Sequence, residues 1–374
     1  MKKIMTVFGT RPEAIKMAPL VKEIECNRDF ESIVVVTGQH REMLDQVLDF
    51  FEINPNFDLN IMEKGQGLEE ITQRVIEGLS NIFQVSKPDI ILVHGDTTTT
   101  FASALTAFYH KIPIGHIEAG LRTWDKYSPF PEEINRQLTD ILADLYFAPT
   151  EQSKKNLLME NHDSGKIYVT GNTAIDAMKF TIRPDYQLNF LFDLDKYKVI
   201  LITVHRRENL GKPMEDIFNA INQLIQEHND IIVVFPIHKN PKIRKIADTT
   251  LIKSQRIKII EPLDVIDFHN LASKSYLILT DSGGIQEEAP HLGVPVLVLR
   301  DTTERPEGII AGTLKLVGTN TTNIVNEVKH LLIDGDAYSK MSNAINPYGD
   351  GQSSKRIVKM IENYLGDEIA SGSK

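Results

Sequence analysis

Two short apolar segments of the sequence are each followed within a few residues by a carboxylate, at the place where a buried strand would end. Asp96 follows the segment Asp89 to Val93, and Glu118 closes the segment Ile112 to Ile117. Asp96 could merely cap the helix that follows it, but Glu118 has no comparable structural role. Because burial in a cleft raises the pKa of a carboxyl group, these two side chains could exchange protons near neutral pH.

A third carboxylate and a histidine occupy comparable places. Glu132 opens a predicted helix together with Glu133, and the helix dipole alone favours acidic residues there, so this position is ambiguous by itself. His205 ends the apolar segment Lys198 to Val204 and is followed by Arg206. A single histidine is usually structural, but a histidine beside arginines at a strand end favours a functional role.

The segment Thr280 to Glu288 predicts a phosphate cradle, because it follows an apolar strand and opens a helix. Ser282, Gly283 and Gly284 would present unhindered backbone N–H groups and a hydroxyl at the positive end of the helix dipole. Glu288 lies nearly two turns further on, where a carboxylate suits a diol such as ribose. The alternative is a plain turn in which Ser282 or the residue before it caps the helix.

Local cations could complete an anion site. Arg11 lies at a predicted junction between a strand and a helix, and Lys16 follows about one and a half turns later. Arg305 lies in a charged segment after another strand, where Arg300 could simply pair with a neighbouring acid. Two such cations can bind diphosphate oxygens. The alternative for Arg11 and Lys16 is a solvated helix start.

Several classes of function are excluded by what the sequence lacks. Gly65-Gln66-Gly67 lacks the third glycine of a dinucleotide fingerprint, and no GxxxxGK[ST] loop occurs. The histidines show no metal-binding spacing, so we expect neither a cofactor nor a metal. Lys and Arg number 41 against 51 Asp and Glu, a formal net charge of -10, which argues against affinity for nucleic acid or anionic membranes.

The cellular compartment is suggested by three features of the chain. Its one cysteine, Cys26, cannot form an internal disulfide, and the first residues contain too short an apolar run for a signal peptide. No segment approaches the roughly 20 apolar residues that cross a bilayer. We therefore expect a cytoplasmic protein.

The elements that must position these residues follow an α/β pattern. At roughly 150 residues per domain, a chain of 374 residues predicts two domains. Short β-branched segments alternate with helical ones, as in a parallel sheet flanked by helices. The predicted strands are Lys3 to Phe8, Ser32 to Thr37, Asp89 to Val93, Ile112 to Ile117, Leu145 to Ala148, Lys166 to Thr170, Lys198 to Val204, Ile231 to Phe235, Ile257 to Ile260, Tyr276 to Thr280, Val294 to Leu299 and Thr313 to Val317.

The predicted fold is α/β, with two Rossmann-like domains that face a central cleft. We predict an N-terminal domain over residues 1–180, a linker over 181–196 and a second α/β domain over 197–352. A C-terminal helix over 353–365 should pack back on the first domain, followed by a flexible tail over 366–374. Ligands of open α/β sheets bind at the carboxyl ends of strands, where most of the residues above are expected.

The chain resembles the non-hydrolysing UDP-N-acetylglucosamine 2-epimerases in unbroken order from about residue 3 to residue 365. No single motif carries this resemblance. The motifs are Gly9-Thr10-Arg11-Pro12-Glu13-Ala14-Ile15-Lys16, His94-Gly95-Asp96, His116-Ile117-Glu118-Ala119-Gly120-Leu121-Arg122, Pro131-Glu132-Glu133-Ile134-Asn135-Arg136, His205-Arg206-Arg207-Glu208-Asn209, Asp281-Ser282-Gly283-Gly284 and Arg300 to Pro306.

The resemblance implies a GT-B fold, a homodimer, no metal or redox cofactor, and UDP-N-acetylglucosamine and UDP as ligands. Asp96, Glu118, Glu132 and His205 match the catalytic positions of the family. The matching substrate-binding residues are Arg11, Lys16, Ser282, Gly283, Gly284 and Arg305 for the diphosphate, Glu288 for ribose and Phe268 for uracil, with Asp96, Glu118 and His205 beside the sugar. Leu263 stands where a relative has a glutamine, so we leave it out of the site.

The resemblance also implies the reaction. UDP leaves C1 while a carboxylate removes the C2 proton, and re-addition of UDP to 2-acetamidoglucal gives UDP-N-acetylmannosamine, a precursor for cell-envelope polysaccharide of the teichoic acid or capsule type. The rival functions are a hydrolysing 2-epimerase, a GT-B glycosyltransferase that uses a UDP-sugar donor, and a nucleotide-sugar sensor without turnover. A sensor would not need proton carriers, which argues against that reading.

Relatives of this type in some bacteria are activated by UDP-N-acetylglucosamine at a second site. Gln39, Arg206 and His238 occupy matching positions, so allosteric activation is expected. Glu42 stands where a neutral glutamine can occur, which puts part of that second site in doubt.

Overall fold

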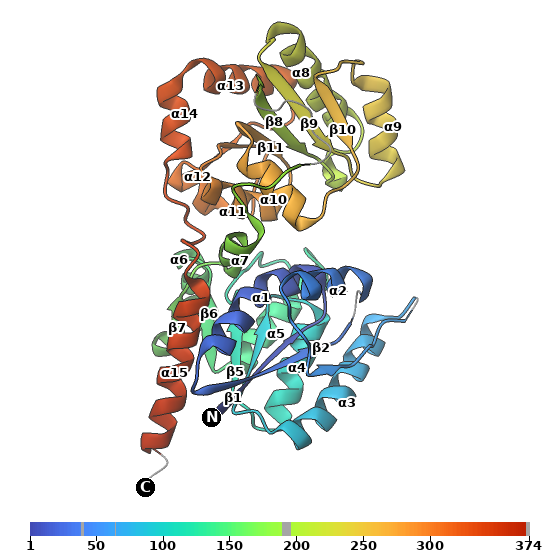
Figure 1. Cartoon of the computed structure of the whole chain (residues 1–374). Helices are drawn as coiled ribbons and strands as arrows, with labels where there is room; N and C mark the ends of the chain where they lie inside the picture. Colours follow the sequence, from blue (N-terminus) through green and yellow to red (C-terminus); the bar gives the residue numbers. More distant parts are fainter. Residues whose placement is uncertain (39–40, 64, 189–195, 372–374) are drawn as a thin grey trace. The chain divides into compact units, whose positions relative to one another are not determined.

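The computed structural model describes residues 1–38, 41–63, 65–188 and 196–371. The chain forms two compact units: unit 1 consists of Met1–Ala177 and Gly349–Lys374, and unit 2 of Met178–Tyr348 (Figure 1). Each unit contains one parallel sheet with helices packed against it, and the predicted fold class is confirmed.

The sheet of unit 1 has seven strands in the order β3-β2-β1-β4-β5-β6-β7, all parallel. The strand order reverses at β1 and β4, which lie side by side, and a ligand site is expected at their carboxyl ends. The strands are β1 Lys2–Phe8, β2 Phe30–Val36, β3 Phe57–Asp58, β4 Ile90–His94, β5 Ile114–Ile117, β6 Leu145–Ala148 and β7 Ile167–Val169.

The helices of unit 1 cover both faces of this sheet because successive side chains of a strand point to opposite faces. Ile4 and Phe8 of β1 pack in one apolar cluster, which includes α1, α2 and α15, whereas Met5 and Val7 pack in another with α3 and α4. The helices are α1 Arg11–Cys26, α2 Arg41–Phe50, α3 Leu68–Ser86, α4 Thr98–Tyr109, α5 Glu132–Leu142, α6 Glu151–Met159, α7 Thr173–Thr181 and α15 Ser353–Ser371, with a short 3-10 helix η1 at Ser164–Lys166.

The C-terminal helix α15 belongs to unit 1 although unit 2 precedes it in sequence (Figure 1). Its apolar residues, among them Ile357 and Ile361, enter the same cluster as α1, and Asn27 Nδ2 donates to Glu362 Oε1 at 2.6 Å. The helix continues to Ser371, six residues beyond its predicted end at residue 365. A single glycine, Gly366, costs a helix only about 1 kcal/mol and does not end it. Residues 372–374 lie outside the described part.

Unit 2 repeats the strand order of unit 1 with six parallel strands, β10-β9-β8-β11-β12-β13. Its strands are β8 Lys198–Thr203, β9 Ile231–Pro236, β10 Ile257–Ile260, β11 Leu277–Thr280, β12 Val296–Val298 and β13 Leu314–Leu316. Its helices are α8 Lys212–Glu227, α9 Pro241–Thr250, α10 Val265–Ser273, α11 Gly283–Glu288, α12 Pro306–Ala311, α13 Thr321–Ile333 and α14 Gly335–Ser342, with 3-10 helices η3 Arg207–Asn209 and η4 Ala289–Leu292.

The predicted boundary between the domains falls inside α7, which begins in unit 1 and ends in unit 2. The described part of the predicted linker 181–196 is attached to α10 of unit 2. The backbone N–H of Arg183 donates to Asn270 Oδ1 at 2.9 Å, and the hydroxyl of Tyr186 donates to Asp267 Oδ1 at 2.8 Å. Residues 189–195 of this segment lie outside the described residues.

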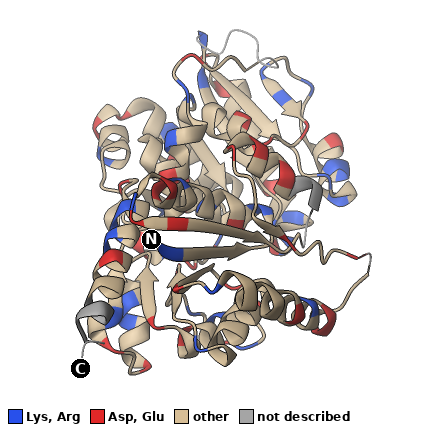
Figure 2. Cartoon of the chain, turned by 60° about the horizontal axis from the view of Figure 1, so that its bottom comes forward, with Lys and Arg blue, Asp and Glu red and all other residues tan. Residues whose placement is uncertain are grey.

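Charged residues of both signs are spread over the helices and loops of each unit, and the strands are mostly uncharged (Figure 2). No helix among the described residues is long and apolar enough to cross a membrane.

Candidate active site

The predicted residues of unit 1 lie where β1, β4 and β5 end. Arg11 and Lys16 belong to the first turns of α1, Asp96 follows β4, and Glu118 follows β5. Because β1, β4 and β5 are neighbouring parallel strands, their carboxyl ends meet at one edge of the sheet. The structure therefore brings most of the acid–base candidates of unit 1 into one place.

Glu13, a residue absent from our predicted site, fixes two of these turns. It forms a capping box with Thr10: Oε2 accepts from the backbone N–H of Thr10 at 2.8 Å and of Gly9 at 3.1 Å. Its other oxygen accepts from the hydroxyls of Thr97 at 2.7 Å and Thr100 at 3.2 Å, at the start of α4. The buried Glu13 thus ties the turn that carries Arg11 to the turn after Asp96.

Glu118 has the most constrained conformation of the candidates. Its backbone φ is 66°, in the left-handed region that non-glycine residues seldom adopt. Its Oε1 accepts from Lys16 Nζ at 2.5 Å and from Asn172 Nδ2 at 2.9 Å, and its Oε2 lies 3.7 Å from His94 Nε2. Since such a backbone persists only where its surroundings impose it, the carboxylate is held in one place.

Asp96 does not cap the helix that follows it. Thr97 is the N-cap of α4 and accepts from the backbone N–H of Thr100 at 3.1 Å. The Asp96 carboxylate instead lies 2.7 Å from Arg136 Nη2. Burial raises the pKa of Asp96 to about 6, even though Arg136 opposes this shift, and Glu118 contributes to it. A carboxyl group with such a pKa can gain or lose a proton near neutral pH.

His94, the last residue of β4, is a second residue that we had not predicted as part of the site. It is buried, and neither ring nitrogen has a hydrogen-bond partner among the described residues. Burial lowers its pKa to about 3. Next to Glu118 there is therefore a neutral imidazole rather than a cation.

Helix α5 begins at Glu132, and its inner face supplies the partner of Asp96. Glu132 is half-buried, whereas Glu133 is fully buried and accepts from the backbone N–H groups of Thr123 at 3.0 Å and Trp124 at 3.1 Å. Burial alone would raise the pKa of Glu133, but these hydrogen bonds to the carboxylate outweigh that effect, so the net pKa is lowered. Glu133 is thus structural, and Glu132 is the acid of this pair that remains available for chemistry.

Replacing Arg136 with methionine is expected to move a pH inflection in turnover. Arg136 lowers the pKa of Asp96, so its removal raises that pKa, and the inflection that Asp96 contributes shifts to higher pH by roughly 1 to 3 units. The measurement is kcat against pH. Arg74→Met is the matched control, because Arg74 of α3 also pairs with carboxylates, Glu63 and Glu70, but not with Asp96. An unmoved inflection in Arg136→Met would contradict the assignment.

In unit 2, the buried Asp281 anchors the segment that carries His205. Its carboxylate accepts from the backbone N–H groups of His205 at 3.0 Å and Arg206 at 2.9 Å, and from Asn209 Nδ2 at 3.0 Å. Asp281 follows β11 and His205 follows β8, which are adjacent strands. The sequence suggested Asp281 only as a helix cap, but the structure gives it this anchoring role.

His205 lies beside two residues of the expected second site. Its ring stacks on His238 with the centroids 5.8 Å apart, and its Nδ1 lies 3.4 Å from Asp281 Oδ1. Burial lowers the pKa of His205, and the nearby His238 and Arg206 lower it further, although Asp281 opposes them. The structure therefore brings Arg206 and His238 together around His205. Gln39 lies outside the described residues, and Glu42 belongs to α2.

The cations of the expected anion site are mostly paired with carboxylates. Arg206 Nη2 lies 2.9 Å from Glu304 Oε1, Arg305 pairs with Glu287, and Lys16 pairs with Glu118 as described above. Arg300 is also paired, with Glu208 at 2.7 Å and with Glu304 at 2.6 Å. Each of these side chains is therefore balanced by a neighbouring acid, and their role in binding an anion stays a prediction. The half-buried Arg11 has no bonded partner among the described residues.

The start of α11 has no side-chain cap. Ser282 is at the N-cap position, but its hydroxyl makes no cap hydrogen bond. A side chain at Gly283 would place a Cβ atom 3.0 Å from Glu304 Oε1 and 3.6 Å from Arg206 Nη2, so it would crowd the end of the Glu304 side chain. A Cβ at Gly284 would meet nothing within 4 Å, which leaves open space beside its backbone.

The residues predicted to hold the nucleoside lie on α10 and α11. Glu288 ends α11, and its Oε2 lies 3.4 Å from Nε2 of the buried His269, which in turn bonds to Thr181 at 2.7 Å. Phe268 and Leu263 are half-buried and pack against the same apolar cluster of unit 2. Glu288 therefore lies against His269, and no signal in the sequence indicated this contact.

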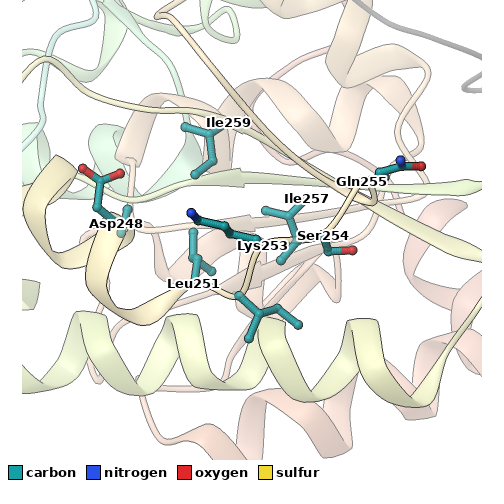
Figure 3. A pocket seen from close by; sticks show the side chains of 9 residues that line it. Asp248, Leu251, Lys253, Ser254, Gln255, Ile257 and Ile259 are labelled. Carbon is teal, nitrogen blue, oxygen red and sulfur yellow. The ribbon is translucent and has the colours of Figure 1, made fainter.

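A hollow of about 560 Å³ in unit 2 lies elsewhere, beside α9 and β10 (Figure 3). Asp248, Lys253 and Ile259 are among the residues that line it, and none of the predicted site residues does. The lining residues run from the end of α9 through 251–255 to Ile257 and Ile259, so the hollow lies along the edge strand β10.

Four residues that contact the predicted ones, or the turns that carry them, were not predicted as part of the site: Glu13, His94, Arg136 and Asp281. Each of them stands inside a motif that already contained a predicted residue. Glu13 also follows Thr10 at the spacing of a capping box, a signal that sequence reasoning could have used. The other three depend on contacts between separate strands and helices, for which a single sequence gives no signal.

Comparison with known proteins identifies the family. A family model described as UDP-N-acetylglucosamine 2-epimerase matches residues 22–362. A Bacillus subtilis strain 168 protein of that name is 61% identical over 359 residues, which cover 96% of this chain and 94% of that protein.

Two solved structures agree with this match. The UDP-GlcNAc 2-epimerase of Neisseria meningitidis, solved bound to UDP-GlcNAc, is 51% identical with a TM-score of 0.84 and covers 96% of this chain and 100% of that one. The Methanocaldococcus jannaschii UDP-GlcNAc 2-epimerase, in complex with UDP-GlcNAc and UDP, is 35% identical with a TM-score of 0.75 and covers 96% and 99%. Because the similarity covers nearly the full length of this chain and of each relative, this protein belongs to the UDP-N-acetylglucosamine 2-epimerases, a family of isomerases with a GT-B-like fold.

Proposed function

We propose that this chain interconverts UDP-N-acetylglucosamine and UDP-N-acetylmannosamine by eliminating UDP and adding it back, without hydrolysis. The product would supply N-acetylmannosamine for cell-envelope polysaccharide. The observation that carries the proposal is the pair of carboxylates at the ends of β4 and β5, each beside its own cation, Asp96 with Arg136 and Glu118 with Lys16.

The chemistry explains why carboxylates of this kind are needed. The C2 hydrogen of an N-acetylhexosamine is not next to a carbonyl, so direct deprotonation is unfavourable. When the C1–O bond breaks, positive charge grows at C1 and acidifies the C2 hydrogen, which a carboxylate then removes to leave 2-acetamidoglucal and UDP. Protonation of C2 from the opposite face, with UDP returning to C1, gives the epimer.

Two proton carriers are therefore required, one for each face of the sugar. Asp96, Glu118 and Glu132 share this work in our proposal. Asp96, with a pKa raised to about 6, is suited to both giving and taking a proton near neutral pH. Glu118 is held in position for this role by Lys16 and by Asn172.

The remaining residues serve the departing UDP. We assign Arg11, Lys16, Ser282, Gly283, Gly284 and Arg305 to the diphosphate, Glu288 to the ribose and Phe268 to the uracil, with His205 stabilising the leaving phosphate. Since the cations of unit 2 are already paired, an entering diphosphate would share or replace the carboxylates Glu287 and Glu304. Closure of the two domains would then keep the eliminated intermediate from bulk water.

Product analysis in heavy water tests this proposal. The purified protein with UDP-N-acetylglucosamine should yield UDP-N-acetylmannosamine that carries deuterium at C2, as followed by proton NMR. A product without deuterium at C2 would overturn the elimination mechanism. Accumulation of free N-acetylmannosamine and UDP would identify a hydrolysing epimerase instead, and sugar transfer to an added acceptor would identify a glycosyltransferase.

A second molecule of UDP-N-acetylglucosamine is proposed to bind beside His205 and to activate the enzyme. Arg206 and His238, the described members of that site, flank His205 in the structure. UDP-N-acetylmannosamine alone should then react slowly until a small amount of UDP-N-acetylglucosamine is added. Full initial rate without that addition would count against the second site.

Helix α5 also supports the proposal of a homodimer. Its polar residues Glu133, Arg136 and Asp140 face inward, whereas Ile134, Leu138 and Ile141 are 36%, 36% and 68% exposed on the outer face. Exposed apolar residues in a continuous row are typical of protein interfaces. A second copy of the chain is the partner that we infer for this face.

Replacing Leu138 with glutamate is expected to give a monomer. A charge in the middle of the outer face of α5 would be desolvated and unpaired in a dimer, so association should weaken by at least about 100-fold. Sedimentation velocity measures the change in mass. Leu158→Glu is the control, since Leu158 is 39% exposed on α6. Dimers that persist unchanged in Leu138→Glu would exclude this face.

A further inference from the structure

His116, in the middle of β5, lies between two oxygen atoms. It is fully buried, with its Nδ1 2.6 Å from Asp140 Oδ1 of α5 and its Nε2 2.7 Å from the carbonyl oxygen of Gly95. A carbonyl oxygen only accepts hydrogen bonds, and so does an ionised carboxylate. Both ring nitrogens must therefore donate, which makes the ring an imidazolium cation.

The surroundings of Asp140 keep its carboxylate ionised. Burial raises the pKa of Asp140, but His116 and Arg122 lower it more, so that the net shift is downward. Its Oδ2 accepts from Arg122 Nη2 at 2.7 Å and from the backbone N–H of Gly120 at 3.3 Å. Arg122 is also paired with Glu160, which follows α6, at 2.5 Å. His116 and Arg122 are thus balanced by Asp140 and Glu160.

This buried network holds both turns that carry the acids of the site. The Gly95 carbonyl bonded to His116 immediately precedes Asp96, and Gly95 adopts a φ of 67°. A Cβ atom at Gly95 would lie 3.4 Å from Glu118 Oε2, so the two turns pack closely. On the other side, Asp140 holds Gly120, two residues beyond Glu118. The network therefore fixes the chain before Asp96 and after Glu118.

We propose that His116 is a positioning residue for this reaction: as a doubly donating imidazolium on Asp140, it sets the places of Asp96 and Glu118 without touching the substrate. The inference rests on the proposed function, in which those two carboxylates move the protons at C2. A neutral ring would leave one nitrogen facing an oxygen without a proton between them, and the Gly95 turn would lose its anchor.

The protonation state of His116 is measurable without any assay of activity. In protein labelled with ¹⁵N at histidine, the resonances that disappear in His116→Leu identify this ring among the 11 histidines. Both of its nitrogens should carry protons at neutral pH. In Asp140→Asn, whose amide can donate to Nδ1, the ring should become neutral while keeping its bond to Gly95. A neutral His116 ring in the unaltered protein would overturn the proposal.

Kinetics then separate positioning from general support of the fold. His116→Leu should lower kcat by about 10²-fold, the cost of displacing catalytic groups by about an ångström, while KM and the affinity for UDP change less than about threefold. Asp140→Asn, which preserves the bonds, should retain most of the kcat that His116→Leu loses. His228→Leu is the control, because the half-buried His228 lies at the end of α8 in unit 2, whereas both turns belong to unit 1.

Two outcomes overturn the proposal: full turnover in His116→Leu, or an equal loss of kcat in the His228→Leu control. If His116→Leu does not fold, the ¹⁵N measurement on the unaltered protein and the kinetics of Asp140→Asn still decide the question. Failure of the proposed function itself would be recognised separately, since the unaltered protein would then give no deuterated epimer in heavy water.

Discussion

Glu118→Gln is expected to lower turnover by about 10³-fold and to leave UDP binding intact. The amide has nearly the same shape as the carboxylate, and its oxygen can still accept from Lys16 and Asn172, but it cannot take a proton from C2. Turnover is measured from the NMR signals of the two epimers, and UDP affinity by calorimetry. A variant that loses UDP binding together with activity would show that Glu118 is structural.

The control for this prediction is Glu151→Gln. Glu151 is exposed at the start of α6 in the same unit, so the loss of its charge should leave turnover unchanged. Exchange of the C2 hydrogen with heavy water provides a second readout. It should slow in Glu118→Gln as much as epimerisation does, because in our proposal both depend on the same proton transfer.

Asp281→Ala is expected to destabilise unit 2 and to lower turnover at the same time. The substitution removes the acceptor of the His205 and Arg206 N–H groups and of the Asn209 amide. Leaving buried donors unpaired costs about 1–3 kcal/mol each, so the free energy of unfolding should fall by roughly 3 kcal/mol or more. Because His205 would also be displaced, kcat should fall by about 10²-fold.

Hydrogen exchange at the amides of β8 and β11 measures the stability of this region directly. Asp248→Ala is the control, since Asp248 is exposed beside the hollow of Figure 3 and its loss should change stability by less than about 0.5 kcal/mol. If exchange in β8 were equally slow in Asp281→Ala and in the control, Asp281 would not be the anchor of the His205 segment.

The strands of both sheets were predictable because they are buried on both faces and therefore appear as short β-branched segments. Leu145–Ala148 and Ile257–Ile260 were predicted at their observed bounds. The two-residue strand β3, Phe57–Asp58, was not, because it has no apolar run of its own and exists only by pairing with β2. The helix α12, Pro306–Ala311, was likewise not predicted, since its charged neighbours indicated a loop.

The sequence predicted at which strand ends the site residues lie, but not how their side chains pair. Topology brings the carboxyl ends of neighbouring parallel strands together, so the position of Asp96 near Glu118 follows from the fold class. Which cation pairs with which acid does not follow from it. Lys16, assigned from the sequence to phosphate, bonds to Glu118, and Arg305 bonds to Glu287, because such pairings depend on side-chain directions that spacing along the chain does not contain.

The hydrogen bonds at the start of α15 give unit 1 a property of practical use. The Asp176 carboxylate accepts from the backbone N–H groups of Ser353 at 3.1 Å and Ser354 at 2.8 Å, close to both points where the chain passes between the units. Unit 2 is thus an insertion whose two ends leave and re-enter unit 1 at one spot. A short peptide that joins Ala177 to Gly349 would therefore remove unit 2 and leave unit 1 as one continuous chain that folds by itself. In that shortened protein, Asp96 and Glu118 could be titrated without unit 2.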